Sequence, residues 1–236
     1  VRKLIRISHV DEISMLGYCI GATIAVVYAG RYPEIPIRNL ILLTAPIDFS
    51  SAPEDSLAMW LAEDRLDLDN LVDSMENVPG ELIAIWAKML KPVENFIGVY
   101  VNLWKQLENE AAVRGWQAIN RWVEDVIPFA GEAFRQFVRD YSRNNELVKG
   151  THVVKGKRVD LSNIDASLLN IIAQYDHLVS RAQSESIMDL VSSEDKELKV
   201  IPSSHVGIMA SRRARYKLWP EVVDWLGQRS GVPGSS

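Results

Sequence analysis

The chain has 236 residues, of which 47% are hydrophobic and 24% charged, and its formal net charge is −5. This is the composition of a globular protein with one large domain or a core with an insertion, and its acidic balance does not favour nucleic-acid binding. A single cysteine excludes a disulfide framework, and neither a signal peptide nor a run of 18 apolar residues is present. We therefore expect a cytoplasmic protein without a transmembrane segment.

The first fifty residues contain two strand patterns and two helix patterns. Residues 1–8 are typical of the end of a helix, 13–18 of a short strand, and 20–29 of a following helix. Residues 39–45 form a continuous apolar run, which predicts a strand buried on both faces of a parallel sheet.

Residues 50–150 show a different pattern, in which helical periodicity replaces the strand signals. The expected helices lie at 57–61, 67–75, 81–90, 96–107, 112–126 and 132–141. A helical stretch of this length between strands of one sheet predicts an inserted cap over the carboxyl ends of the strands. We expect the tryptophans of this stretch to pack in the cap core and between parts of the cap, rather than to line a ligand site: Trp60, Trp86, Trp104, Trp116 and Trp122.

Strands and helices alternate again after the insertion. A β-hairpin is expected at 152–159 with its turn at 155–156, followed by strands at 168–173 and 198–201 and helices at 182–191 and 218–226. This alternation predicts a doubly wound, mostly parallel sheet. The expected domains are a core part at 1–49, the cap at 50–150, a second core part at 151–229 and a flexible tail at 230–236.

The turn between the first strand and its helix carries a chemical motif, Gly17-Tyr-Cys19-Ile-Gly21. G-x-C-x-G is the nucleophile elbow of the α/β-hydrolase fold with cysteine in place of serine. The two glycines are expected to remove side chains that would collide at this strained turn. Cys19 would lie at a helix N-terminus, where the helix dipole stabilises a thiolate. A lone cysteine is more often a small buried hydrophobe, so the motif alone leaves both interpretations open.

Two further residues extend the elbow to a candidate catalytic triad. Asp176 follows the third long strand, and His205 lies in the loop after the last one. The chain order nucleophile, acid, histidine is that of the α/β hydrolases, and all three residues follow the carboxyl ends of strands. Asp176 could instead form a turn and His205 could be an ordinary loop histidine. We expect His9 and His152 to be surface residues.

The distinctive motifs extend beyond these residues, and they occur at 16–21, 44–49, 70–75, 78–80, 121–125, 128–129, 131–136, 145–147, 156–164, 176–179, 204–207, 219–220 and 225–226. With them the sequence resembles the catalytic subunit of poly(3-hydroxyalkanoate) synthases, most closely the two-subunit classes III and IV, over the whole chain to about Arg229. The cap and hairpin motifs separate this family from other cysteine hydrolases.

The resemblance implies an acyltransferase that polymerises (R)-3-hydroxyacyl-CoA, typically 3-hydroxybutyryl-CoA, into polyhydroxyalkanoate with release of CoA. Cys19 would carry the growing chain as a thioester and His205 would deprotonate Cys19. Asp176 would activate the 3-hydroxyl group of the incoming acyl group, besides or instead of orienting His205. The backbone N–H of Ile20 would be one oxyanion donor.

No cofactor is implied by the resemblance, because the CoA thioester is the substrate, and no metal is expected. The implied partners are a second copy of the chain, a second synthase subunit and the surface of polymer granules in the cytoplasm. We also hypothesise that the acidic stretch 50–90 is mobile and helps to form a dimer or partner contact.

The chain departs from the family pattern in two ways. Ala22 stands where a second glycine usually follows the elbow, and we expect little effect from this change. The strands that precede the elbow in α/β hydrolases are expected upstream of Val1, together with a second oxyanion donor, so that this chain alone would fold poorly or be inactive.

Two other functions remain open from the sequence. One is a cysteine-dependent α/β hydrolase that acts on esters, lactones or polymer. The other is a non-catalytic granule or assembly protein that keeps the fold.

Overall fold

The computed structural model describes residues 1–51 and 60–230, and the chain divides into two compact units. An α/β unit combines the segments on either side of a helical unit, which spans 53–143. The helix expected at 57–61 lies mostly outside the described residues, as does the tail expected at 230–236.

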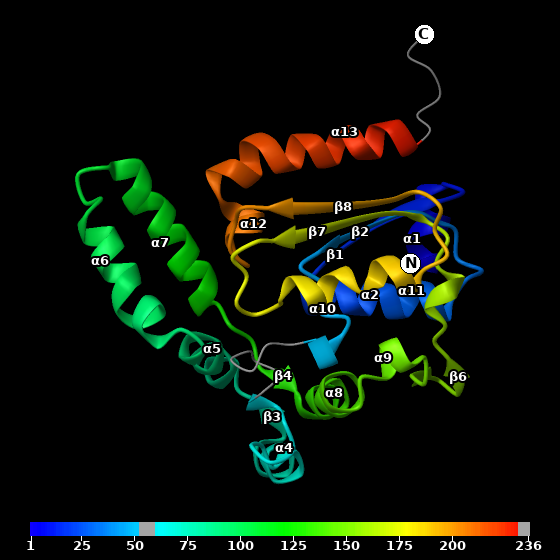
Figure 1. The fold of residues 1–236 in the computed structure, drawn as a ribbon, viewed down its shortest axis with the longest axis horizontal. Helices are drawn as coiled ribbons and strands as arrows, with labels where there is room; N and C mark the ends of the chain where they lie inside the picture. The colour runs from blue at the N-terminus through cyan, green and yellow to red at the C-terminus, as the bar shows by residue number, and fades with distance from the viewer. Residues whose placement is uncertain (52–59, 231–236) are drawn as a thin grey trace. The chain divides into compact units, whose positions relative to one another are not determined.

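A sheet of four parallel strands organises the α/β unit, in the order β1-β2-β7-β8 (Figure 1). The strands are β1 (Ile13–Tyr18), β2 (Ile37–Leu43), β7 (Ser167–Ala173) and β8 (Lys196–Ile201). The two central strands are buried on both faces, as their continuous apolar runs predict. β8 begins two residues earlier than expected, because Lys196 and Glu197 already pair with β7.

Helices cover both faces of this sheet, which confirms the doubly wound arrangement (Figure 1). On one face lies α13 (Trp219–Arg229), and on the other lie α2 (Ile20–Arg31) and α10 (Arg181–Glu185). The shorter elements are α1 (Arg2–Ser8), η1 (Phe49–Ser51), α9 (Glu146–Lys149), η4 (Leu161–Asn163), α11 (Ile187–Leu190), α12 (Gly207–Ala210) and η5 (Ala214–Leu218). The single helix expected at 182–191 is divided into α10 and α11 around Ser186.

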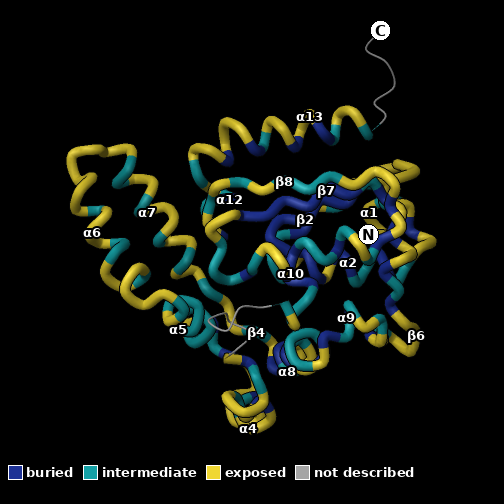
Figure 2. The backbone as a smooth tube through the Cα atoms, in the orientation of Figure 1, coloured by how far each residue is buried: buried dark blue, intermediate teal, exposed yellow. Residues whose placement is uncertain are grey.

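The core of the α/β unit lies on both sides of the central strands (Figure 2). Leu43 and Ile171 pack with Val222 and Trp225 of α13 on one face. The other face is covered by α2, whose small side chains let the helix lie close to the sheet, as the sequence predicts: Ala22, Ala25 and Ala29 are all buried.

The predicted hairpin is confirmed, with β5 (Val153–Val154) pairing antiparallel to β6 (Lys157–Arg158). Its turn residues have the positive φ angles of a type I′ turn, 50° at Lys155 and 71° at Gly156.

The two histidines expected at the surface differ in their environment. His9 is exposed, as predicted. His152 is buried, and its Nδ1 lies 3.1 Å from Oε2 of Glu146. The prediction for His152 was wrong because its imidazole packs beside Glu146 of α9, a contact with a different element that the local sequence pattern does not reveal.

The helical unit has its own small core, whose buried residues include Leu68, Val72, Phe134 and Val138. Its described elements are α4 (Leu68–Met75), β3 (Asn77–Val78), α5 (Gly80–Met89), η2 (Glu94–Gly98), α6 (Val99–Trp104), α7 (Glu110–Glu124), β4 (Phe129–Ala130), α8 (Gly131–Gln136) and η3 (Phe137–Arg143). The sequence predicted only helices, but β3 and β4 form a two-residue antiparallel ladder that is too short to show a strand period. Among the described helices, none is both long and apolar enough to span a membrane.

The tryptophans of the helical unit do not form a common core. Trp86 packs against the core cluster, with its ring centroid 6.3 Å from that of Phe134. Trp104 is 77% exposed, Trp122 53% and Trp60 42%. The prediction of core packing was therefore wrong for these three. Trp104 and Trp122 are exposed because they lie in α6 and α7, which contain no buried residue.

The side chain of Asn145 connects the two segments of the α/β unit that lie before and after the helical unit in the sequence. Oδ1 of Asn145 accepts a hydrogen bond from the N–H of Phe49 at 3.1 Å, and its Nδ2 donates to Oδ1 of Asp48 at 2.7 Å. Burial raises the pKa of Asp48, but hydrogen bonds from Ser50, Ser51 and Asn145 outweigh it and hold this pKa below its usual value. Asn145 therefore belongs to the α/β unit, and the helical unit ends at 143 rather than at 150.

Asn145 itself has a φ of 51°, in the left-handed region that asparagine tolerates better than most residues. We predict that Asn145→Gly loses the two hydrogen bonds and lowers the free energy of unfolding by roughly 1–3 kcal/mol. Asn145→Ala loses the same bonds and also strains the backbone, so its loss should be larger. Urea denaturation followed by circular dichroism measures the free energy of unfolding of both variants. Wild-type stability in both would contradict a stabilising role for the Asn145 hydrogen bonds.

Candidate active site

The elbow places Cys19 in a strained turn between β1 and α2. Cys19 has φ 53° and ψ −127°, a conformation that non-glycine residues rarely adopt. Its N–H donates to the carbonyl of Leu43 at 3.0 Å, which ties the turn to β2. Its own carbonyl accepts from the N–H groups of Ala22 at 2.9 Å and Thr23 at 3.3 Å. Cys19 is thus the N-cap residue of α2 and is held from both sides by main-chain hydrogen bonds.

The two elbow glycines have different environments. A Cβ on Gly17 would lie 2.4 Å from Cα of Ala22, a distance that real side chains essentially never show. A Cβ on Gly21 would meet no described atom within 4 Å. The expectation of a steric need for glycine is therefore correct for Gly17 and wrong for Gly21, because α2 turns its second residue away from β1.

His205 and Asp176 are hydrogen-bonded to each other at the carboxyl ends of β8 and β7. Nδ1 of His205 lies 2.7 Å from Oδ2 of Asp176. The other carboxylate oxygen of Asp176 accepts from the N–H groups of Leu178 at 2.8 Å and Val179 at 3.0 Å. The Asp176 side chain is 1% exposed. Main-chain donors therefore fix the orientation of the carboxylate that faces the imidazole.

Cys19 completes a line of three interacting side chains. Burial lowers the pKa of His205, but hydrogen bonds to Asp176 and Cys19 and the negative charges of both outweigh it and raise this pKa to about 10. Because Asp176 occupies Nδ1, Nε2 is the ring nitrogen left to interact with Cys19. The fold thus brings together the three residues that the sequence predicted as a triad, in the order carboxylate, imidazole, sulfur.

Tyr18 is a further residue of this site, which the sequence analysis did not single out. Its ring centroid lies 5.1 Å from that of the His205 imidazole, with the planes tilted by 38°. Its hydroxyl donates to the main-chain carbonyl of His205 at 3.0 Å. The available signal was its position, because Tyr18 directly precedes the cysteine within the elbow motif.

Ile20 is the first residue of α2 and follows the candidate nucleophile directly. The first N–H groups of a helix have no acceptor four residues earlier within the helix, so they can bind an anion at that end. This location is the one that the sequence analysis assigned to an oxyanion donor.

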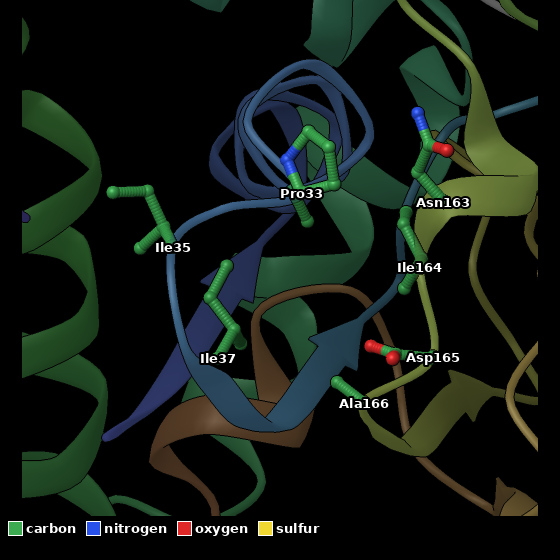
Figure 3. Close-up of a pocket in the computed structure, with 8 residues that line it drawn as sticks. Pro33, Ile35, Ile37, Asn163, Ile164, Asp165 and Ala166 are labelled. Carbon is green, nitrogen blue, oxygen red and sulfur yellow. The ribbon is translucent and has the colours of Figure 1, made fainter. Parts of the chain in front are cut away.

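A small cavity in the α/β unit lies away from these residues (Figure 3). Its lining includes Ile35, Ile37, Asn163 and Asp165, which lie next to the amino ends of β2 and β7. The strands are parallel, so the cavity is at the opposite edge of the sheet from Cys19. It does not contribute to the candidate active site.

The sheet and the elbow define an α/β-hydrolase fold with cysteine at the nucleophile position, and comparison with solved structures confirms the fold. A monoacylglycerol lipase from Paleococcus ferrophilus superposes with a TM-score of 0.61 at 14% identity, covering 97% of this chain and 72% of the lipase. An alpha/beta fold family hydrolase from Bacillus anthracis gives a TM-score of 0.52 at 12% identity, covering 94% of this chain and 70% of that protein. At such identities the likeness shows the fold alone.

Sequence comparison leads from this class to a particular group of proteins. The poly(3-hydroxyalkanoate) polymerase subunit PhaC of Haloferax mediterranei is 37% identical over 220 residues, which are 93% of this chain and 44% of that subunit. The subunit of the same name from Allochromatium vinosum is 35% identical over 93% of this chain and 61% of its own length.

No family model matches the chain. The chain spans about half of the length of the curated relatives that it matches. Over nearly all of its own length, it is related to poly(3-hydroxyalkanoate) polymerase subunits, as the sequence motifs indicated.

The two elbow glycines offer a matched pair of substitutions. We predict that Gly17→Ala lowers the free energy of unfolding by at least roughly 1–3 kcal/mol, because the new methyl group would collide with main-chain atoms of Ala22. Gly21→Ala should be neutral or stabilise α2 by up to about 1 kcal/mol, because alanine favours the helix and has space there. Equal losses in both variants, measured by urea denaturation, would contradict the described packing of the elbow.

The pKa of His205 gives a second test of the site. Its value of about 10 predicts that the imidazole stays protonated at neutral pH and loses its proton only in alkaline solution. Asp176→Asn and Cys19→Ala should each lower the titration midpoint, because each removes a hydrogen bond and a negative charge. NMR of histidine-labelled protein measures the midpoint, with His205→Asn to assign the signal. A midpoint near 6.5 in the unsubstituted protein would show that the three groups do not interact as described.

Proposed function

We propose that the chain catalyses the polymerisation of (R)-3-hydroxyacyl-CoA, with 3-hydroxybutyryl-CoA as the expected substrate, into polyhydroxyalkanoate with release of CoA. One observation carries the proposal. A chain related over 93% of its length to polymerase subunits has a cysteine at its elbow that raises the pKa of His205, and this histidine is hydrogen-bonded to Asp176.

The first chemical step is a thioester exchange at Cys19. The Sγ thiolate attacks the carbonyl carbon of the acyl-CoA, and the bond from this carbon to the CoA sulfur breaks. His205, protonated because its pKa is raised to about 10, donates the proton that the departing CoA thiolate takes up. The N–H of Ile20 stabilises the oxyanion that forms in between. The acyl group is then held on Cys19 as a thioester.

Acylation changes the protonation of His205 in the direction that the next step requires. Two of the causes that raise its pKa, the hydrogen bond to Cys19 and the charge of Cys19, disappear when the sulfur is acylated. Burial then lowers the pKa with only Asp176 opposing it. His205 has lost its proton to CoA at this stage, so it can accept the proton of the 3-hydroxyl group that attacks the thioester.

The hydrogen bonds of Asp176 favour an orienting role for this carboxylate. One oxygen accepts from His205 and the other from two main-chain N–H groups. The carboxylate is also only 1% exposed, so the 3-hydroxyl group of a substrate has little access to it. We therefore assign Asp176 to holding and charging His205, rather than to activating the hydroxyl group itself.

The partners follow from the same proposal. The relatives are named as polymerase subunits, which supports assembly with a second synthase subunit, and we also propose a homodimer. The product is an insoluble polyester, so the protein would act at the surface of polymer granules in the cytoplasm. No cofactor and no metal take part in the proposed steps.

The test is an assay of CoA release together with polymer formation, using the purified protein and 3-hydroxybutyryl-CoA. We predict that Cys19→Ala and His205→Asn each lower the rate of CoA release by roughly 10³-fold or more, as loss of a triad member does in other enzymes. His9→Asn is the matched control, because His9 is exposed and lies outside the site; it should keep the wild-type rate.

Three outcomes would contradict the proposal, each in a different way. Release of free hydroxy acid without polymer would indicate a cysteine-dependent hydrolase. Unchanged CoA release in Cys19→Ala would place the chemistry elsewhere. No CoA release from the folded wild-type protein with any tested hydroxyacyl-CoA would indicate a non-catalytic assembly protein.

A further inference from the structure

We propose that Tyr18 is a positioning residue that holds His205 against Cys19, a role that rests on the proposed function of this site. Its aromatic ring and its hydroxyl group would act together, the ring on the imidazole and the hydroxyl on the main chain of the same histidine.

The topology of the sheet shows why such a contact is needed. Cys19 follows β1 and His205 follows β8, and these are the two outer strands of the four described in the sheet. The sulfur and the imidazole must therefore meet across the carboxyl ends of β2 and β7. Small movements of the loop after β8 would change the distance between them directly.

Tyr18 spans this gap with a fixed hydrogen bond. It is the last residue of β1, and its hydroxyl donates to the carbonyl of His205 at 3.0 Å. The strand of the nucleophile is thus connected to the main chain of the histidine, without passing through the reacting atoms.

The ring of Tyr18 is itself held by the core. It packs against the buried cluster that includes Leu43, Ile171 and Ile208. On its other side the ring contacts the imidazole, with centroids 5.1 Å apart. The imidazole is therefore bounded by Tyr18, by Asp176 at Nδ1 and by Cys19, which restricts its rotation.

The Tyr18 hydroxyl group remains protonated at neutral pH, so it can donate its hydrogen bond. Burial, followed by the negative charges of Cys19 and Asp176, raises the pKa of Tyr18 above its usual value. The phenol therefore keeps the proton that it donates to His205.

Two variants separate the hydroxyl group from the ring. Tyr18→Phe removes the hydrogen bond and keeps the ring, and Tyr18→Leu removes both. We expect kcat for CoA release to fall roughly tenfold in the first and roughly a hundredfold in the second, with KM within about twofold of wild type, since a hydrogen bond of this kind corresponds to roughly a factor of ten. Tyr216→Phe is the matched control, because Tyr216 is 64% exposed and makes no contact with the site.

A second measurement needs no turnover and separates this proposal from the proposed function. The rate at which iodoacetamide alkylates Cys19 at pH 7 should fall in the same order, wild type, Tyr18→Phe, Tyr18→Leu, and the NMR titration midpoint of His205 should move towards 6.5 in that order. If the protein releases no CoA but these shifts occur, the proposed reaction is wrong and the positioning role stands.

The positioning role is overturned if folded Tyr18→Phe keeps the wild-type kcat, alkylation rate and His205 midpoint. If Tyr18→Leu does not fold, Tyr18→Phe alone decides, because it keeps the ring that packs on the core. A loss of stability in Tyr18→Phe with unchanged alkylation and titration would also overturn it, because Tyr18 would then be a structural residue only.

Discussion

The close approach of β1 to the first turn of α2 is the constraint on which the candidate site depends. Gly17 allows this approach because no Cβ fits beside the main chain of Ala22. The chain can then turn at Cys19 with a φ of 53° and still donate the Cys19 N–H to Leu43. The strain of that turn is borne by main-chain hydrogen bonds on both sides, and it places the sulfur at the start of a helix, at the sheet edge where parallel strands end.

The rest of the site follows from the parallel sheet and from burial. Asp176 and His205 reach Cys19 because their strands, β7 and β8, end at the same edge. Hydrogen bonds connect these groups in series. Main-chain N–H groups donate to the Asp176 carboxylate, this carboxylate is hydrogen-bonded to the His205 imidazole, and the Tyr18 hydroxyl donates to the main-chain carbonyl of His205. The raised pKa of His205 is the electrostatic result of this arrangement. In the proposed reaction this imidazole acts as an acid before acylation and as a base afterwards.

The sequence predicted the sheet and the turn that carries Cys19 well, because both depend on short-range signals. Continuous apolar runs mark β2 and β7, and G-x-C-x-G marks a turn whose sterics are local. The errors occurred where long-range packing decides. His152 is buried beside Glu146 of α9, and Trp104 is exposed because its helix contains no buried residue. The elbow motif places Tyr18 beside Cys19, but the contact of Tyr18 with His205 joins residues 187 positions apart, so the motif could not predict that contact.

The central claim is that Cys19 carries the acyl chain as a thioester, while His205 gives a proton to the departing CoA and takes one from the attacking 3-hydroxyl group. The most direct test is mass spectrometry of the peptide that contains Cys19, after rapid acid quenching of the protein with 3-hydroxybutyryl-CoA. The account predicts one or more hydroxybutyryl units on Cys19. Neutral hydroxylamine should release them, as it does thioesters. Polymer formation with an unmodified Cys19 at every quenching time would contradict it.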